Sequence, residues 1–260
     1  MEKILQRLRD NEPTLTSLYF DNFYGKRLDP EDVEYALEKN MHPFYYGIRL
    51  EDEDVEAAAV AAALERNTTL TSLTIENTRL TDVGGVAVAG ALERNTTLTE
   101  LNLAHNHLAS LSAEALARML ERNTTLTSLD LSGNFFGEVA GVAFARALER
   151  NTTLTALNLA FNGLGEDTGV AFARAMERNT TLTFLRLTAY MKDETLQKIE
   201  QLLEANRDRR KHAWKFKLLK NRIKRQEQQN QQPDIGRLSK LPADILYKIT
   251  AQKCLQLLLI

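Results

Sequence analysis

The feature that most constrains this chain of 260 residues is a segment that returns every 28 residues. Asn67-Thr68-Thr69-Leu70-Thr71 recurs four more times almost unchanged. The leucines that open the copies are Leu70, Leu98, Leu126, Leu154 and Leu182. Two less regular copies precede them, at 15–18 and 43–48, which makes seven units. One such unit cannot bury its leucines alone, so the sequence predicts that the units stack as a solenoid.

Each unit is predicted to hold a short strand followed by a helix. Apolar residues alternate around Leu101 and Leu103, as in a strand with one buried face. Later in the unit, apolar residues at offsets 0, 1, 3 and 4, for example 144, 145, 147 and 148, mark one face of a helix. Stacked parallel strands lie about 4.8 Å apart, whereas helices need about 8–10 Å. The predicted fold is therefore an α/β curved horseshoe, with parallel strands inside and helices outside.

Asparagines recur at two places in the unit. Asn106, Asn134 and Asn162 follow the strands, and we expect them to form a ladder that satisfies backbone groups where the chain leaves the sheet. Thr78 stands at the same position one unit earlier. Asn151 and its equivalents follow the helices, and there we expect the left-handed conformation that ends a helix.

The pattern L-x-x-L-x-L-x-x-N-x-L, complete from Leu98 to Leu108, resembles the ribonuclease-inhibitor type of leucine-rich repeat. The nearly identical Leu-Glu-Arg-Asn-Thr-Thr-Leu-Thr copies also resemble repeats of secreted effectors of intracellular, Legionella-like bacteria. The resemblance covers about residues 1–205. It implies a non-enzymatic module that binds, and by covering an active site inhibits, a host protein or a fellow effector. It also implies delivery into the host cytoplasm without a signal peptide, and the N-terminus lacks a signal's apolar stretch.

The ends of the chain differ from the middle. Residues 1–205 are predicted to form the solenoid, with Ile4, Leu5 and Leu8 in an N-terminal cap and the seventh helix at 193–205. Residues 206–230 form a basic extension, since 206–225 carry ten Lys or Arg and one acid in a chain of net charge −2. We favour a helix that caps the last unit. The alternative is a basic amphipathic helix for an anionic membrane or nucleic acid, both less favoured partners.

The last predicted segment, 231–260, is a linker followed by a short helix. Residues 241–249 resemble the opening of an F-box, the helical motif that docks substrate adaptors onto a ubiquitin ligase. That resemblance implies an adaptor as an alternative function. The simpler interpretation is an amphipathic helix with Ile245, Leu246 and Ile249 on one face.

Few residues suggest catalysis or metal binding. His105 and His107 flank Asn106 and are interpreted as surface histidines rather than metal ligands. Because Cys254 is the single cysteine of the sequence, the chain cannot form an intramolecular disulfide. We interpret Cys254 as a small buried residue rather than as a nucleophile. Phosphate-binding Gly-rich, H-E-x-x-H and G-x-S-x-G motifs are absent from the sequence. We therefore predict no enzyme, no cofactor and no small-molecule substrate.

The inner, concave face of the sheet is the predicted binding surface. Residues that flank the buried strand leucines point into the hollow, because side chains alternate along a strand; the alternation extends this to Ala104, Ser132 and Ala160. The units are otherwise nearly alike, so their variation gathers on this face. Aromatic residues are typical interface anchors, and the acids would attract a basic partner. The predicted partner-binding residues are Tyr19, Tyr45, Glu76, Glu100, Asn102, His107, Asp130, Phe135, Asn158, Phe161, Phe184 and Arg186.

Overall fold

The computed structural model describes residues 2–21, 53–187 and 191–228. The chain divides into two compact units, Met1–Asn206 and Arg207–Ile260. The first unit is an α/β leucine-rich-repeat solenoid of alternating strands and helices. Its elements are α1 (Glu2–Arg9), β1 (Ser17–Asp21), α3 (Glu53–Leu64), β2 (Ser72–Glu76), α4 (Asp82–Leu92), β3 (Glu100–Asn102), α5 (Ser110–Arg122), β4 (Ser128–Asp130), α6 (Gly137–Leu148), β5 (Ala156–Asn158), α7 (Glu166–Met176), β6 (Phe184–Arg186) and the start of α8 (Asp193–Gln228).

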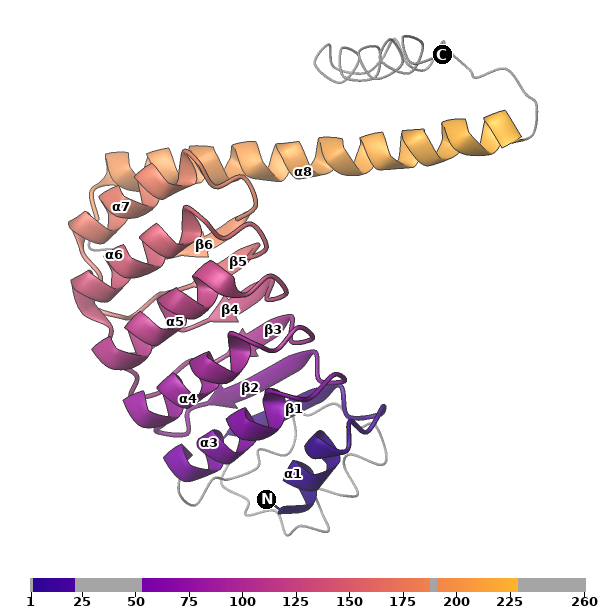
Figure 1. Cartoon of the computed structure of the whole chain (residues 1–260). Helices are drawn as coiled ribbons and strands as arrows, with labels where there is room; N and C mark the ends of the chain where they lie inside the picture. The colour runs from indigo at the N-terminus through magenta and orange to yellow at the C-terminus, as the bar shows by residue number, and fades with distance from the viewer. Residues whose placement is uncertain (1, 22–52, 188–190, 229–260) are drawn as a thin grey trace. The chain divides into compact units, whose positions relative to one another are not determined.

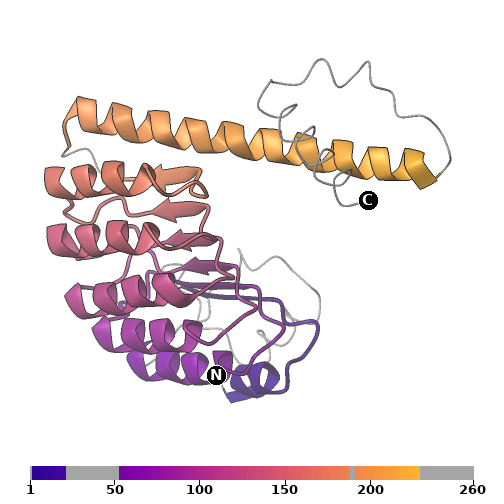
Figure 2. The same cartoon turned by 45° about the horizontal axis from the view of Figure 1, so that its top comes forward.

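The described strands form one parallel sheet in the order β1-β2-β3-β4-β5-β6. Helices α3 to α7 lie in a row along one face of that sheet (Figures 1 and 2). In both views the row of helices is longer than the row of strands, as the wider spacing of packed helices requires. The other face of the sheet carries no described helix.

The core lies between the strands and the helices, and it confirms the predicted apolar pattern. The middle leucine of each three-residue strand from β3 to β5 is buried, for example Leu101 and Leu129. The helix residues at the predicted offsets are also buried, and Phe144 and Phe172 are fully enclosed. Buried alanines such as Ala145 and Ala173 let the helices pack close to the sheet.

The asparagines after the strands form the predicted ladder. Asn106 Nδ2 donates to the carbonyl of Ile75 in the preceding unit at 2.6 Å and to that of Leu103 in its own unit at 3.1 Å. Its Oδ1 accepts from the Thr78 amide at 3.0 Å. Asn134 and Asn162 repeat the two donor contacts one and two units later. The ladder joins the backbone of successive units where the chain leaves the sheet.

The asparagines after the helices behave differently from our prediction. Asn123 is extended, with φ −69° and ψ 130°, and its four equivalents are not left-handed either. They form a second buried ladder instead. Asn123 Nδ2 donates to Leu92 O at 2.8 Å, and its Oδ1 accepts from the amide of Leu126 at 2.7 Å. The side chain thus ties the end of one helix to the next strand and to the preceding unit. The equivalent residues are Asn67, Asn95, Asn151 and Asn179.

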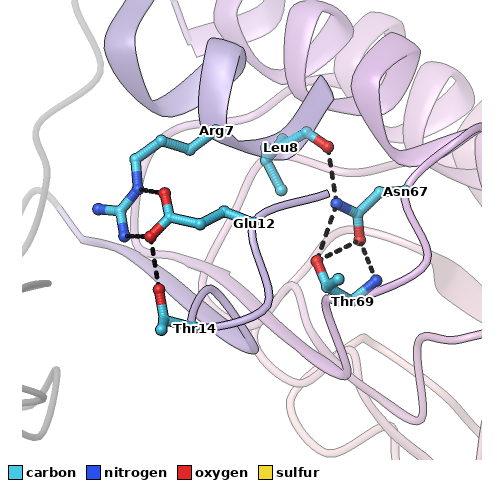
Figure 3. A network of polar contacts seen from close by, with 6 residues as sticks. All are labelled: Arg7, Leu8, Glu12, Thr14, Asn67 and Thr69. Carbon is cyan, nitrogen blue, oxygen red and sulfur yellow. Dashed lines mark hydrogen bonds and ion pairs between the residues drawn. The ribbon is translucent and has the colours of Figure 1, made fainter. Parts of the chain in front are cut away.

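The N-terminal cap closes this second ladder. Asn67 Nδ2 donates to the carbonyl of Leu8 in α1 at 2.8 Å, while Arg7 and Glu12 form an ion pair beside it (Figure 3). Leu8 is fully buried, and Ile4 and Leu5 are 4% exposed, so all three side chains belong to the hydrophobic core. Leu8 therefore occupies the position that Leu64 takes one unit later.

The order of units at this end departs from the sequence expectation. The copy at 43–48 should have placed its strand between the first and third strands. Instead β1 pairs directly with β2, from Ser17 opposite Ser72 to Asp21 opposite Glu76. The strands of the described units therefore do not require the copy at 43–48 between them. Residues 22–52, which contain that copy, lie outside the described residues.

At the other end, the first turns of α8 serve as the helix of the last unit. Ile199 and Leu203 are buried, with 4% and 2% of their surface exposed, as predicted. Asn206 Nδ2 donates to the carbonyls of Asn179 and Leu182 at 3.0 and 2.9 Å, which extends the second ladder into α8. Asn206 is also the last residue of the first compact unit.

In the second unit, α8 continues to Gln228. Lys211 Nζ lies 3.4 Å from Asp208 Oδ1, and His212 Nδ1 lies 2.8 Å from the carbonyl of Asp208. Side chains from 214 onward, the F-box-like segment 241–249 and Cys254 lie outside what the structure describes. Among the described helices, none is both long and apolar enough to cross a membrane.

Candidate functional site

The candidate site is the open face of the sheet, the face opposite the helices, together with the loops that follow the strands. In each three-residue strand the middle residue points to the core and the two end residues point to the open face. Glu100 and Asn102 of β3 illustrate this, because they flank the buried Leu101 and are exposed and half-buried. Half of the twelve predicted binding residues come from these end positions.

Two of the predicted acids are held by amides of the next strand. Asn102 Nδ2 donates to Glu76 Oε2 at 2.9 Å, and Asn158 Nδ2 donates to Asp130 Oδ2 at 2.9 Å. Asp130 Oδ1 also accepts from the Ser132 amide at 2.9 Å. These four side chains are half-buried. These hydrogen bonds fix the orientation of the side chains, so they form a rigid floor rather than adaptable contacts.

Three other predicted residues are free to meet a partner. Glu100, Phe184 and Arg186 are exposed, and within the described ranges no hydrogen bond or ion pair engages the side chain of Glu100 or Arg186. Phe184 exposes 51% of its surface at the edge strand β6. Glu100 on β3 is in register with Phe184 on β6, three strands away, and Arg186 lies two residues further along that strand. With strands about 4.8 Å apart and a rise of about 3.3 Å per residue, Glu100 and Arg186 lie about 16 Å from each other across the face. The open face thus has an acidic middle and a basic, aromatic end.

The loops after the strands add an aromatic rim. Phe135 and Phe161 expose 66% and 64% of their surface, and the rings of His107 and Phe135 lie 5.7 Å apart. Phe161 is left-handed, with φ 58°, like His105 two units earlier. Gly133 holds the same conformation between them, and a Cβ there would lie 2.5 Å from His105 Nδ1. This rim is therefore built by close stacking of consecutive loops.

The remaining predicted positions divide in three ways. Tyr19 of β1 is half-buried on the open face, while Tyr45 lies in the part of the chain that is not described. Ala104, Ser132 and Ala160 are buried, with 3%, 7% and 3% of their surface exposed, so the prediction that they face the hollow is wrong. The chain turns toward the asparagine ladder after Asn102 and Asn158, and the alternation of a strand ends there.

Sequence reasoning missed a row of carboxylates that cap helices of the following unit. Asp82 Oδ1 accepts from the amides of Ala109 and Ser112 at 2.8 and 3.0 Å, and from the Ser112 hydroxyl at 2.6 Å. Burial raises the pKa of Asp82, but these hydrogen bonds outweigh it and hold the pKa below its ordinary value. Asp54, Glu138 and Glu166 make equivalent contacts. The recurrence of acids at a spacing of 28 would have been the signal.

A second overlooked feature is a row of exposed aliphatic residues on the helices. Val55, Val83, Leu111 and Val139 recur at the same spacing and expose between 63% and 85% of their surface. They lie away from the open face of the sheet. In contrast, the described residues contain no cluster of three or more His, Cys, Asp or Glu side chains placed to hold a metal ion.

These features define a leucine-rich-repeat solenoid, in which the core residues repeat from unit to unit and the residues of the open face vary. The Leucine Rich repeat family model matches residues 66–89, 94–117, 122–145 and 150–173. These four segments lie in the described solenoid, and each runs from the second asparagine ladder into the following helix.

Two solved structures are similar to the chain. One is described as Leiomodin-1 Actin-Binding Site 2 and is 22% identical, with coverage of 87% of this chain and 96% of that chain and a TM-score of 0.49. The other is the tropomodulin C-terminal domain of Caenorhabditis elegans, 15% identical, with coverage of 81% and 95% and a TM-score of 0.46. No curated protein matches the sequence.

Proposed function

We propose that this protein is a non-enzymatic binding module that grips one partner protein between the open face of its sheet and the aromatic rim. The observation that carries the proposal is the contrast between the two faces of each strand. The core side repeats the same leucines, whereas the open side presents Glu100, Phe184 and Arg186 in exposed positions. Exposed aromatic and arginine side chains are typical interface anchors.

The charges on the open face indicate which charges a complementary partner surface would carry. Glu100, together with the fixed acids Glu76 and Asp130, favours a basic group opposite β2 to β4. Arg186 favours an acidic group of the partner about 16 Å from the group that faces Glu100. Phe184 beside it would enter an apolar pocket of the partner.

The test is affinity purification of the full chain from cells, followed by mass spectrometry, with Glu100→Arg and Phe184→Ala as variants. We expect each variant to lose its specific partner, by about tenfold or more for a central contact. Glu114→Arg is the matched control, because Glu114 is an exposed glutamate of the same unit that lies on α5. Equal capture by Glu100→Arg and Glu114→Arg would count against the proposal.

We further propose the setting that the sequence resemblance implies. The chain acts as a bacterial effector in the host cytoplasm and inhibits its partner by covering the partner's active site. A translocation assay with a reporter fused to the full chain tests delivery, and an activity assay of the captured partner tests inhibition. A partner that stays fully active when bound would refute the inhibitory part alone.

The two alternative functions remain sequence predictions. The adaptor function depends on residues 241–249, and membrane or nucleic-acid binding depends on residues 207–225. The side chains of 241–249 and of 214–225 lie outside the described part of the chain. Truncation before residue 238 tests the first, and sedimentation with anionic vesicles at low and high salt tests the second.

A further inference from the structure

The Asn-Thr-Thr copies of the repeat match the acceptor sequence for N-linked glycosylation, Asn-x-Thr with any residue but proline in the middle. No other asparagine of the sequence is followed by Ser or Thr two residues later. Because a glycan is bulky and hydrated, an asparagine that carries one normally lies at the surface. The acceptors are the residues of the second ladder: Asn67, Asn95, Asn123, Asn151 and Asn179.

The fold buries all of these acceptor side chains. They expose only 3% to 5% of their surface, although the threonine that follows each one is exposed. The turn itself therefore reaches the surface, and the asparagine side chain points inward from it. Each acceptor thus lies where a sugar cannot be attached to the folded chain.

Both hydrogens of the acceptor nitrogen are engaged in the ladder. Asn123 Nδ2 donates to the carbonyl of Leu92 at 2.8 Å and to that of Asn95 at 3.3 Å. The acceptors at 95, 151 and 179 repeat these two contacts. Asn67 makes the corresponding bond to the carbonyl of Leu8 in the cap (Figure 3). A carboxamide nitrogen has two hydrogens, so the ladder uses both of them.

Glycosylation would remove one of these hydrogens. The transfer forms a bond between Nδ2 and the first carbon of a sugar chain that is carried on a lipid pyrophosphate. The bond between that carbon and the pyrophosphate oxygen breaks, the oxygen keeps the electron pair, and Nδ2 gives up one proton. The product keeps a single N–H. Its sugar would have to lie between Asn123 and the two carbonyls that are 2.8 and 3.3 Å away, and a closely packed interior has no room for it.

We propose that N-glycosylation and folding exclude each other in this protein. A unit whose ladder asparagine carries a glycan cannot close against the preceding unit, and a solenoid depends on the contacts between neighbouring units. The chain therefore folds only in a compartment without a transferase for Asn-x-Thr. A protein that reaches a host cytoplasm directly meets this condition, whereas one that first enters the endoplasmic reticulum does not. The inference does not depend on the partner-binding proposal.

The experiment expresses the full chain in mammalian cells with and without a cleavable secretory signal. Mass spectrometry and gel mobility before and after N-glycanase detect glycans, and protease resistance and thermal unfolding report the fold. The backbone amides of the acceptor threonines donate to the ladder and stay in place in the matched variant. That variant removes the acceptor sequences and keeps the ladder asparagines: Thr69→Val, Thr97→Val, Thr125→Val, Thr153→Val and Thr181→Val.

With the signal, we expect the wild-type chain to carry glycans on ladder asparagines. It should yield about tenfold less protease-resistant protein than the variant, or lower still, because the modified chain does not reach its folded state. Without the signal, both chains should stay unglycosylated and fold. An inhibitor of the lipid-linked sugar donor should restore folding of the wild-type chain with the signal. This last arm needs no substitution, so it does not depend on how well the variant folds.

Three results would overturn the inference. One is a wild-type chain that carries a glycan on a ladder asparagine and resists protease as well as the variant does. Another is a wild-type chain that enters the endoplasmic reticulum, stays unglycosylated and folds there, because folding would then bury the acceptors before the transfer. The third is an inhibitor that blocks glycosylation without restoring the fold, because something other than the glycan would then prevent folding. None of these results bears on capture of a partner by the chain expressed without the signal.

Discussion

Replacement of Asn123 by alanine should destabilise the solenoid far more than removal of the charged residue beside it. Asn123 is 5% exposed, so water cannot replace its contacts. Its Nδ2 donates to Leu92 O at 2.8 Å, and its Oδ1 accepts from the amides of Thr125 and Leu126 at 2.9 and 2.7 Å. Three such bonds contribute about 1 kcal/mol each, and a buried group left unsatisfied adds about 1–3 kcal/mol. We expect Asn123→Ala to lower the free energy of unfolding by about 4 kcal/mol.

Arg122→Ala is the matched comparison. Arg122 forms an ion pair with Glu93 at 2.6 Å, but 68% of its side chain is exposed, and such surface pairs contribute about 0–1 kcal/mol. Urea unfolding followed by circular dichroism and by intrinsic fluorescence measures both variants. Asn123→Asp should be at least as damaging as alanine, because its carboxylate would face the Leu92 carbonyl. A loss below about 1.5 kcal/mol for Asn123→Ala would refute the claim that this ladder joins the units.

Two further predictions concern a loop and the pH dependence of stability. Gly133→Ala should destabilise by at least about 1 kcal/mol more than Gly163→Ala in the same urea assay: both glycines are left-handed, but only at 133 would a Cβ meet His105. The pKa of Asp82 lies below 3.8 and that of Glu12, hydrogen-bonded by Arg7, below 4.5. The stability they contribute is therefore complete above these ordinary values and is lost as the pH falls through their lower folded values. Urea midpoints should drop below about pH 4.5, and less steeply in Asp82→Asn; equal pH profiles would contradict this assignment.

The repeated core was predictable because its physics is local to one unit. Period-two leucines and the helical offsets around Phe144 identify their buried faces without knowledge of the neighbouring units. The ladder at Asn106 was predictable for a similar reason, since backbone groups at the end of a strand need partners.

The conformation of Asn123 was not predictable in this way. Asparagine tolerates a left-handed backbone, but its side chain can also bond the following amides, and the sequence alone does not decide between the two. The decision comes from carbonyls of the preceding unit, such as Leu92 O, which only stacking brings within reach. The pairing of β1 with β2 has the same origin. Leu8 and Leu64 differ by 56 residues, two whole periods, so periodicity cannot say which units become neighbours.

The register of the sheet explains why only some of the predicted site residues are available for binding. Asp130 lies directly opposite Asn158, whose amide reaches its carboxylate. Glu100 lies between Ser72 and Ser128, and no amide stands opposite it. The same alternation that places both acids on the open face thus leaves Glu100 free and holds Asp130 in place. Energy for binding a partner should therefore come more from Glu100 than from Asp130, because an acid already satisfied by its own fold gains less from a new contact.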